Sequence, residues 1–185
     1  MRLLALTLLF LPGPLMAESG CEDIWFTRNL IMDRAGYCFS SPLGAALFDN
    51  SDCTGTQISL DPAAQAQVAR IRALEAQHGC QVDTNRTWMD MPDMAFRKAL
   101  TVLPIRTEGE WGCLGWTGAA APLYAGYYEP FHAIGQVGPG DYVSFAYENV
   151  GDWIYVTTYA PVWGAFRSAG WLYWPGEKPC ADAAG

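Results

Sequence analysis

Two histidines and six cysteines are the residues best suited to nucleophilic or acid–base chemistry in this chain. A Cys–His pair would need a free thiolate beside the imidazole, and cysteines in an exported chain are better assigned to disulfides. His78 follows a helical pattern, where an imidazolium at the last turn suits the helix dipole. His132 precedes a strand pattern in a polar turn. We therefore expect both histidines at the surface or at a helix end.

Other patterns that would indicate catalysis are weak. The segment SSPLG at residues 40–44 begins a helical pattern and lacks the glycine spacing of a nucleophile elbow. Asp90 and Asp93 stand on either side of a proline, which is typical of a solvated turn and does not mark a carboxylate pair for glycan cleavage. No convergent group of metal ligands is visible. The sequence predicts a non-catalytic protein with no cofactor and no metal.

The aromatic residues are the stronger candidates for binding. Seventeen of them lie among the 64 residues from Trp111 to Trp174. A small barrel cannot bury them all, and exposed aromatic clusters mark interaction surfaces. Trp153 and Trp171, at strand starts, are expected in the barrel core. The candidate ligand-binding residues are Tyr124, Tyr127, Tyr128, Trp163, Phe166 and Arg167. Alternatively, the loop that carries Trp163 folds back and buries this ring, and Arg167 pairs with an acid.

Charged residues also mark the stretch TRNLIMDRAGYCF at residues 27–39, which predicts a helix that stops at Gly36. On a helical wheel, Arg28 falls in the middle of the apolar face, where a charge is costly unless it is paired. An arginine fork satisfies several carbonyls or a carboxylate at once. We predict that Arg28 is largely buried and bonded to such a partner. Asn29, Arg34 and Gly36 are likewise expected to have structural roles.

The first 17 residues have the layout of a secretory signal peptide, with an apolar run over residues 3–11 and cleavage expected after Ala17. The run is shorter than the roughly 20 residues that span a bilayer. We expect a periplasmic or secreted protein without a transmembrane segment. Cleavage leaves ten Lys and Arg against 19 Asp and Glu, a net charge near −9, which argues against nucleic acids and anionic membranes as partners. Glu18 disfavours the alternative that Cys21 is a lipoprotein acceptor.

The even number of cysteines in an exported chain predicts three disulfides, although six cysteines allow 15 pairings. No two cysteines have C-x-x-C spacing, which argues against a zinc ribbon or a redox motif. The preferred pairs are Cys38–Cys53, Cys21–Cys80 and Cys113–Cys180. The first closes a short loop, the second ties the first helix to the end of the third, and the third staples the C-terminal half.

The chain changes character near residue 100, and the predicted fold class is α+β. Residues 18–80 have three helical patterns and form a small disulfide-stapled helical module. Residues 81–103 are a linker or a packing segment. Residues 104–180 predict a small β-barrel. Its five strand patterns are PLYAG, HAIGQV, DYVSFAY, DWIYVTTY and GWLYW.

Two family resemblances follow. The C-terminal half resembles a bacterial SH3-type domain through LYAG, AIGQVGPGDYVSF, GDWIYV and SAGWLYW. The resemblance implies an SH3-like five-stranded barrel of a kind that often binds peptidoglycan or peptide in an aromatic groove. The insertion YAPVWGAFR at residues 159–167 departs from that pattern and would reshape or cover the groove.

The N-terminal half resembles the YARHG module of exported bacterial proteins. The matching residues are Arg28, Asn29, Arg34, Gly36, Tyr37 and Phe39. Ala35 replaces the motif's histidine, so acid–base chemistry is not expected there. The whole chain is similar to exported alphaproteobacterial proteins that join such a module to an aromatic, cysteine-stapled half.

Two functions remain open. The first is a non-catalytic cell-envelope module that binds peptidoglycan, a peptide or an envelope protein through its aromatic half. The second is a structural or regulatory periplasmic protein whose halves pack together without a small ligand. A hydrolase of the cell envelope is the least favoured alternative.

Overall fold

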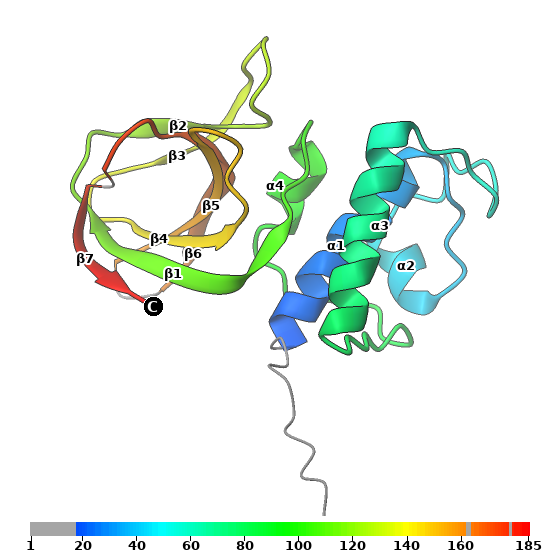
Figure 1. The fold of residues 1–185 in the computed structure, drawn as a ribbon. Helices are drawn as coiled ribbons and strands as arrows, with labels where there is room; N and C mark the ends of the chain where they lie inside the picture. The colour runs from blue at the N-terminus through cyan, green and yellow to red at the C-terminus, as the bar shows by residue number, and fades with distance from the viewer. Residues whose placement is uncertain (1–17, 162–163, 178) are drawn as a thin grey trace, which may run out of the picture.

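The structure is a computed structural model that describes residues 18–161, 164–177 and 179–185. The expected signal peptide, residues 1–17, lies outside the described residues. A helical half and a sheet half lie side by side, so the fold is α+β (Figure 1). The helices are α1 (Glu18–Arg34), α2 (Pro42–Leu47), α3 (Pro62–Gln77) and α4 (Met94–Ala99). The strands are β1 (Arg106–Trp116), β2 (Ala121–Tyr124), β3 (Ala133–Val137), β4 (Tyr142–Tyr147), β5 (Trp153–Tyr159), β6 (Phe166–Tyr173) and β7 (Cys180–Ala184).

Local capping signals decide where the helices of the N-terminal half begin and end. The Ser41 hydroxyl accepts a hydrogen bond from the Gly44 amide (3.2 Å), and the Asp61 carboxylate accepts one from the Ala64 amide (2.8 Å). A proline follows each of these caps, where its missing amide hydrogen costs nothing. Gly36, with φ of +84°, follows the end of α1 in the left-handed conformation that favours glycine.

The three disulfides have the expected pairing: Cys21–Cys80, Cys38–Cys53 and Cys113–Cys180. They indicate an oxidising extracellular or periplasmic compartment. The first two support a small helical core in which α1 packs on α3. Because Cys21 is bonded to Cys80, its sulfur is not available for lipidation. In the described part of the chain, none of the helices is long and apolar enough to cross a membrane.

The C-terminal half is one antiparallel sheet of seven strands in the order β3-β2-β6-β5-β4-β1-β7. The five expected strands correspond to β2–β6, whereas β1 and β7 were not anticipated. The sheet curls strongly (Figure 1), but its edge strands β3 and β7 are not paired with each other in the described residues. The sheet is therefore open, and its strand number exceeds that of the expected five-stranded barrel.

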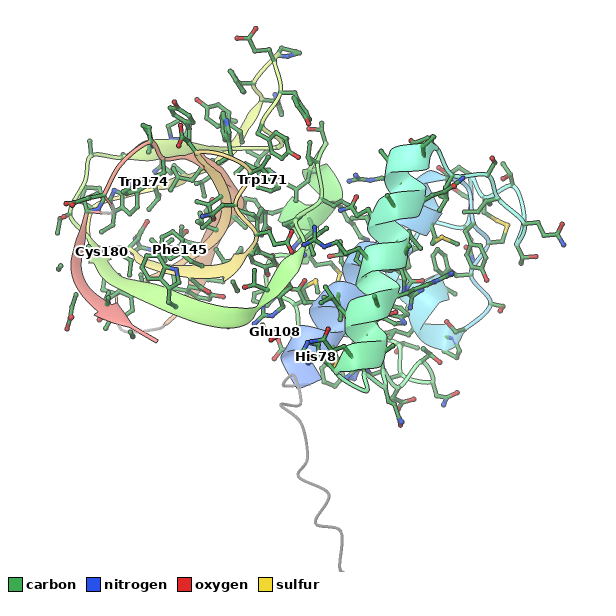
Figure 2. All side chains as sticks on the ribbon, in the orientation of Figure 1. His78, Glu108, Phe145, Trp171, Trp174 and Cys180 are labelled. Atoms are coloured by element: carbon green, nitrogen blue, oxygen red, sulfur yellow. A yellow bond between two sulfur atoms is a disulfide. The ribbon has the colours of Figure 1, made fainter. Side chains whose placement is uncertain are left out.

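Both faces of this sheet are covered along its centre. Burial is continuous over residues 143–147 of β4 and residues 154–158 of β5, as expected for strands with neighbours on both faces. Phe145 lies inside the curve of the sheet, in an apolar cluster that is separate from the one that contains Trp171. Trp171 lies on the outer face of the sheet toward α4 (Figure 2). Trp153 is only half-buried at the margin of this outer face. The two tryptophans thus lie outside the barrel core to which the sequence assigned them.

The segment over residues 81–103 packs on both halves. Helix α4 lies between the sheet and the helices α1 and α3 (Figure 1). Phe96 of α4 contacts Phe166 of β6 edge to face, with ring centroids 5.6 Å apart. The Trp171 indole donates a hydrogen bond to the Val102 carbonyl (2.8 Å). The segment joins the helical core to the outer face of the sheet, so the two halves share one apolar cluster.

Candidate functional site

The groups first considered for catalysis are in structural positions. Each of the six cysteines is in a disulfide, so no thiolate is available. His78 is the C-cap residue of α3, as expected for a helix-end histidine, but it is buried and not at the surface. Its Nε2 lies 3.4 Å from a Glu108 carboxylate oxygen, where α3 ends near β1 (Figure 2). His132 is exposed just before β3.

Four aromatic side chains form a continuous cluster at one margin of the outer sheet face. This aromatic patch consists of Tyr124, Phe131, Trp153 and Tyr173. Phe131 stacks on Trp153 with ring centroids 5.3 Å apart and lies 5.5 Å from Tyr124. Trp153 contacts Tyr173 (5.2 Å) and Tyr124 (5.8 Å). Phe131 is 46 % exposed and Tyr173 is 51 % exposed, so the patch offers ring surface to solvent.

Strand pairing positions this patch. Trp153 and Tyr173 are direct partners in the β5–β6 ladder, and Tyr124 pairs with Trp171 between β2 and β6. Side chains of cross-strand partners emerge on the same face about 5 Å apart, which brings the rings into contact. Phe131 comes from the β2–β3 loop and covers Trp153. Of these four residues only Tyr124 was among the sequence candidates, because register and loop path decide which rings meet.

Two other candidate tyrosines lie on the β2–β3 loop, and their ring contacts are with Trp171 and with each other. Tyr127 is half-buried edge-on against Trp171, with ring centroids 4.8 Å apart. Burial, together with the neighbouring Tyr128, raises the pKa of Tyr127 to about 12. Tyr128 contacts Tyr127 (4.6 Å) and is 68 % exposed.

The remaining candidates lie at the opposite end of the β5–β6 hairpin. Phe166 is half-buried between Phe96 and Tyr159. Arg167 forms an ion pair with Asp141, which was the alternative expected for it. Trp163 lies outside the described residues. The sequence candidates therefore do not form a single site, and of those that the structure describes only Tyr124 belongs to the aromatic patch.

The most elaborate polar arrangement surrounds Arg97 of α4, which is 0 % exposed. Its Nε donates to Asp93 (2.8 Å), and its Nη1 and Nη2 donate to the two carboxylate oxygens of Asp23 (3.0 and 2.7 Å). Nη1 also donates to the Thr27 hydroxyl (2.9 Å), and Nη2 to the Tyr147 hydroxyl. All five guanidinium hydrogens are thus used inside the protein, and none is left for a ligand.

Two tyrosines complete this Arg97 network. The Tyr147 hydroxyl donates to Asp23 (2.5 Å), and the Tyr155 hydroxyl donates to Asp93 (2.9 Å). Burial alone would lower the pKa of Arg97, but the two carboxylates outweigh it and raise that pKa well above its usual value. The solvated turn expected at Asp93 is therefore wrong: Asp93 is buried, because it faces a buried cation. The sequence feature that could have indicated this ion pair is the i,i+4 spacing of Asp93 and Arg97.

The residues of the YARHG-like motif have structural contacts. The Arg28 Nε donates to both carboxylate oxygens of Glu75 in α3 (3.0 Å each), so an acid is its partner as expected, although its side chain is 18 % exposed and only partly buried. Asn29 donates to the Trp25 carbonyl one turn earlier (2.8 Å). Arg34 donates from Nη2 to the Leu100 carbonyl (2.6 Å). These contacts hold α1 against α3 and against the segment after α4.

Fold and contacts define an α+β protein in which a disulfide-stapled helical half is interlocked with a curled antiparallel sheet that carries an aromatic surface. The chain belongs to the family described as domain of unknown function DUF4453, which matches residues 79–185. The YARHG domain matches residues 3–76. The boundary between the two matches follows α3, so α4 and the whole sheet fall in the first family. Comparison with curated proteins and with solved structures finds no significant match.

Proposed function

We propose that this chain is an exported, non-catalytic protein of the cell envelope that binds peptidoglycan, a peptide or an envelope protein through the aromatic patch. The observation that carries this proposal is that the rings of Phe131 and Tyr173 are exposed while both contact Trp153, which holds them in place. Fixed aromatic rings lose little conformational entropy on binding and supply large apolar area. Rings of this kind stack on the apolar faces of sugars and on peptide side chains.

Polar groups flank the patch in a way that suits such a ligand. A cavity of about 320 Å³ beside Trp153 is lined by Asn149, Asp152 and Trp174. Ligand sites commonly combine ring surface with a few polar groups that set orientation. Amide and carboxylate oxygens accept hydrogen bonds from hydroxyl or amide groups of a ligand that lies on the rings.

The C-terminal half is, in this proposal, an SH3-like domain enlarged at one edge. The strong curl of the antiparallel sheet and the agreement of β2–β6 with the expected strands support it. Strands β1 and β7, tied by Cys113–Cys180, then form the enlargement.

A second candidate function is favoured by the Arg97 network. This network joins α1, α4 and the sheet through buried charges, which fits a structural or regulatory periplasmic protein without a small ligand. The two candidate functions differ in the role of the aromatic patch, since only the first requires the patch to bind a partner.

Co-sedimentation with purified peptidoglycan sacculi, together with capture of cross-linked envelope proteins, tests the first candidate. We expect Phe131→Ala to weaken retention about tenfold, the effect of losing one well-placed aromatic contact. Trp88→Ala is the matched control, because Trp88 is 63 % exposed and lies outside the patch. Equal retention of the protein and Phe131→Ala, or no captured material at all, would favour the second candidate.

A further inference from the structure

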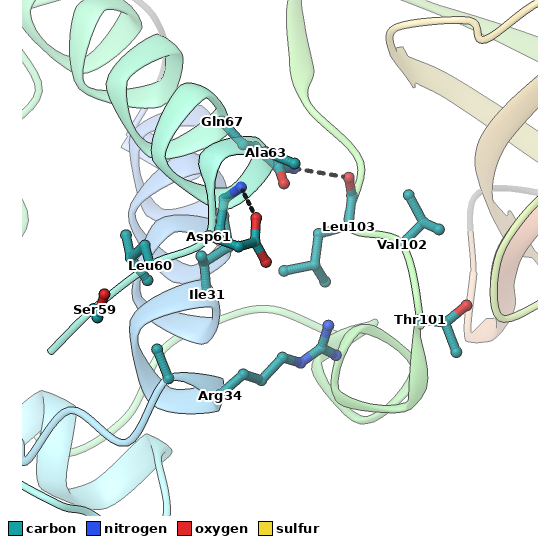
Figure 3. A pocket seen from close by; sticks show the side chains of 12 residues that line it. Ile31, Arg34, Ser59, Leu60, Asp61, Ala63, Gln67, Thr101, Val102 and Leu103 are labelled. Atoms are coloured by element: carbon teal, nitrogen blue, oxygen red, sulfur yellow. Dashed lines mark hydrogen bonds between the residues drawn. The ribbon is translucent and has the colours of Figure 1, made fainter.

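The helical half contains a cavity that is separate from the aromatic patch. Its volume is about 550 Å³, within the range of roughly 300–1,000 Å³ that is typical of ligand pockets. It lies between the end of α1, the start of α3 and the segment that follows α4 (Figure 3). Apolar side chains of all three segments line it, among them Ile31, Leu60 and Leu103.

Two opposite charges line the same cavity. Figure 3 shows the Arg34 guanidinium and the Asp61 carboxylate approaching it from different sides. Among the described residues, the hydrogen bonds of Arg34 all start from Nη2, and they reach the carbonyls of Arg97, Lys98 and Leu100. Its Nε and Nη1 hydrogens are thus free to meet an anion.

Asp61 likewise has one oxygen in use and one to spare. Oδ1 accepts the capping hydrogen bond from the Ala64 amide (2.8 Å), and Oδ2 accepts none from the described residues. No ion pair within 4.0 Å joins Asp61 to Arg34 in the described structure. Each charge is therefore available to a ligand group of the opposite sign.

We propose that this cavity binds a short apolar peptide with free termini, its carboxylate at Arg34 and its ammonium group at Asp61. A guanidinium fork suits a carboxylate, and an exposed carboxylate oxygen suits an ammonium group. The apolar walls between them suit small aliphatic side chains. A single amino acid would leave most of the volume empty, which favours two or three residues. The site is in the helical half and does not depend on the function proposed for the patch.

Calorimetric titration of the purified protein with trialanine tests the site. We expect saturable binding of trialanine, and about tenfold weaker binding of both its N-acetyl and its C-terminal amide forms, because each loses one charge-assisted contact. These ligand changes leave the protein unaltered, so the result does not depend on any variant folding. Equal affinity for the three forms, or no binding of trialanine at millimolar concentration, would overturn the proposal.

Asp61→Asn assigns the ammonium contact to its residue. Asparagine caps a helix as well as aspartate does, so α3 should be unaffected. We expect this variant to bind trialanine about tenfold more weakly and to bind N-acetyl-trialanine as the unaltered protein does. Asp52→Asn, an exposed acid outside the cavity, is the control for net charge, and Phe131→Ala should bind trialanine normally. Unchanged discrimination between the two peptides by Asp61→Asn would refute the assignment.

Discussion

At the residue scale, Arg97 shows how one buried cation depends on its partners. Its five hydrogens meet two carboxylates and two hydroxyls from α1, α4 and β4. The desolvation of such a charge is offset only while the partners are complete. Because these partners come from the helical half and from the sheet, an arrangement of α4 that left the charge unpaired would be costly.

Removing this guanidinium should be costly. We expect Arg97→Met to lower the free energy of unfolding by about 3–5 kcal/mol, because Asp93 is then buried without a cation and Asp23 keeps only Arg106, at 3.4 Å. Urea denaturation followed by fluorescence measures this change. Arg70→Met is the control, since Arg70 pairs with Glu148 at the surface and should cost less than about 1 kcal/mol. Similar losses in both variants would contradict the role of the network.

At the element scale, α1 and α3 are each followed by a glycine in the left-handed conformation, but the two glycines have different surroundings. Gly36 and Gly79 both have positive φ after a helix, at +84° and +61°. A Cβ added at Gly36 would lie 2.6 Å from the Thr54 hydroxyl oxygen, whereas one added at Gly79 would meet nothing within 4 Å. The turn after α1 is thus closely packed against Thr54, the residue that follows Cys53 of the Cys38–Cys53 disulfide.

These two glycines give a matched comparison. We expect Gly79→Ala to destabilise the protein by about 1 kcal/mol, the cost of the left-handed conformation alone. Gly36→Ala should cost more, because the Thr54 side chain must also shift. Thermal unfolding of the two variants side by side measures the difference. A Gly36→Ala variant as stable as Gly79→Ala would show that the loop yields without cost.

At the scale of the whole molecule, the buried tyrosines tie stability to pH. Burial raises the pKa of Tyr147 and Tyr155 well above the usual value near 10, and the Asp93 charge adds to the rise for both. Above pH 10 the unfolded chain releases phenolic protons that the folded protein keeps. The contribution of these two tyrosines to the free energy of unfolding is therefore fully present below pH 10. It is lost as pH rises, by up to about 1.4 kcal/mol per pH unit for each tyrosine.

Urea unfolding between pH 9 and pH 12 measures this slope. We expect a falling free energy of unfolding over that interval for the unaltered protein. Tyr155→Phe should show a shallower fall, since it has one titrating group fewer. A flat profile across the interval would mean that these hydroxyls are not as buried as the structure places them.

Short-range signals in the sequence account for much of the fold. Ser41 and Asp61 cap their helices because a side-chain oxygen reaches an amide three residues on, within one turn of chain. The β-branched and aromatic runs of β2–β6 indicate strands for an equally local reason. Strands β1 and β7 were not predicted, because the glycines, acids and alanines in them have weak strand preference. In the structure, β1 pairs with β4, and β7 pairs with β1.

The candidate site was less predictable. Aromatic richness indicated that rings would be exposed, but only Tyr124 of the final patch was selected, since contact between Phe131, Trp153 and Tyr173 depends on register and on a loop path. Arg28 was expected to be largely buried and bonded to carbonyls or an acid, and it bonds an acid but is only partly buried. The fully buried arginine is Arg97, in the segment expected to be a linker or a packing segment.

The sequence by itself determined compartment signals, helix ends and most strands, because each depends on composition or on neighbours along the chain. It favoured one cysteine pairing among 15, and the structure confirmed that pairing. Only the tertiary structure decided which charges are buried, which rings form the patch, and that Arg34 and Asp61 line one cavity. Such features join residues dozens of positions apart. Their energies depend on desolvation and on close packing, which exist only once distant segments meet.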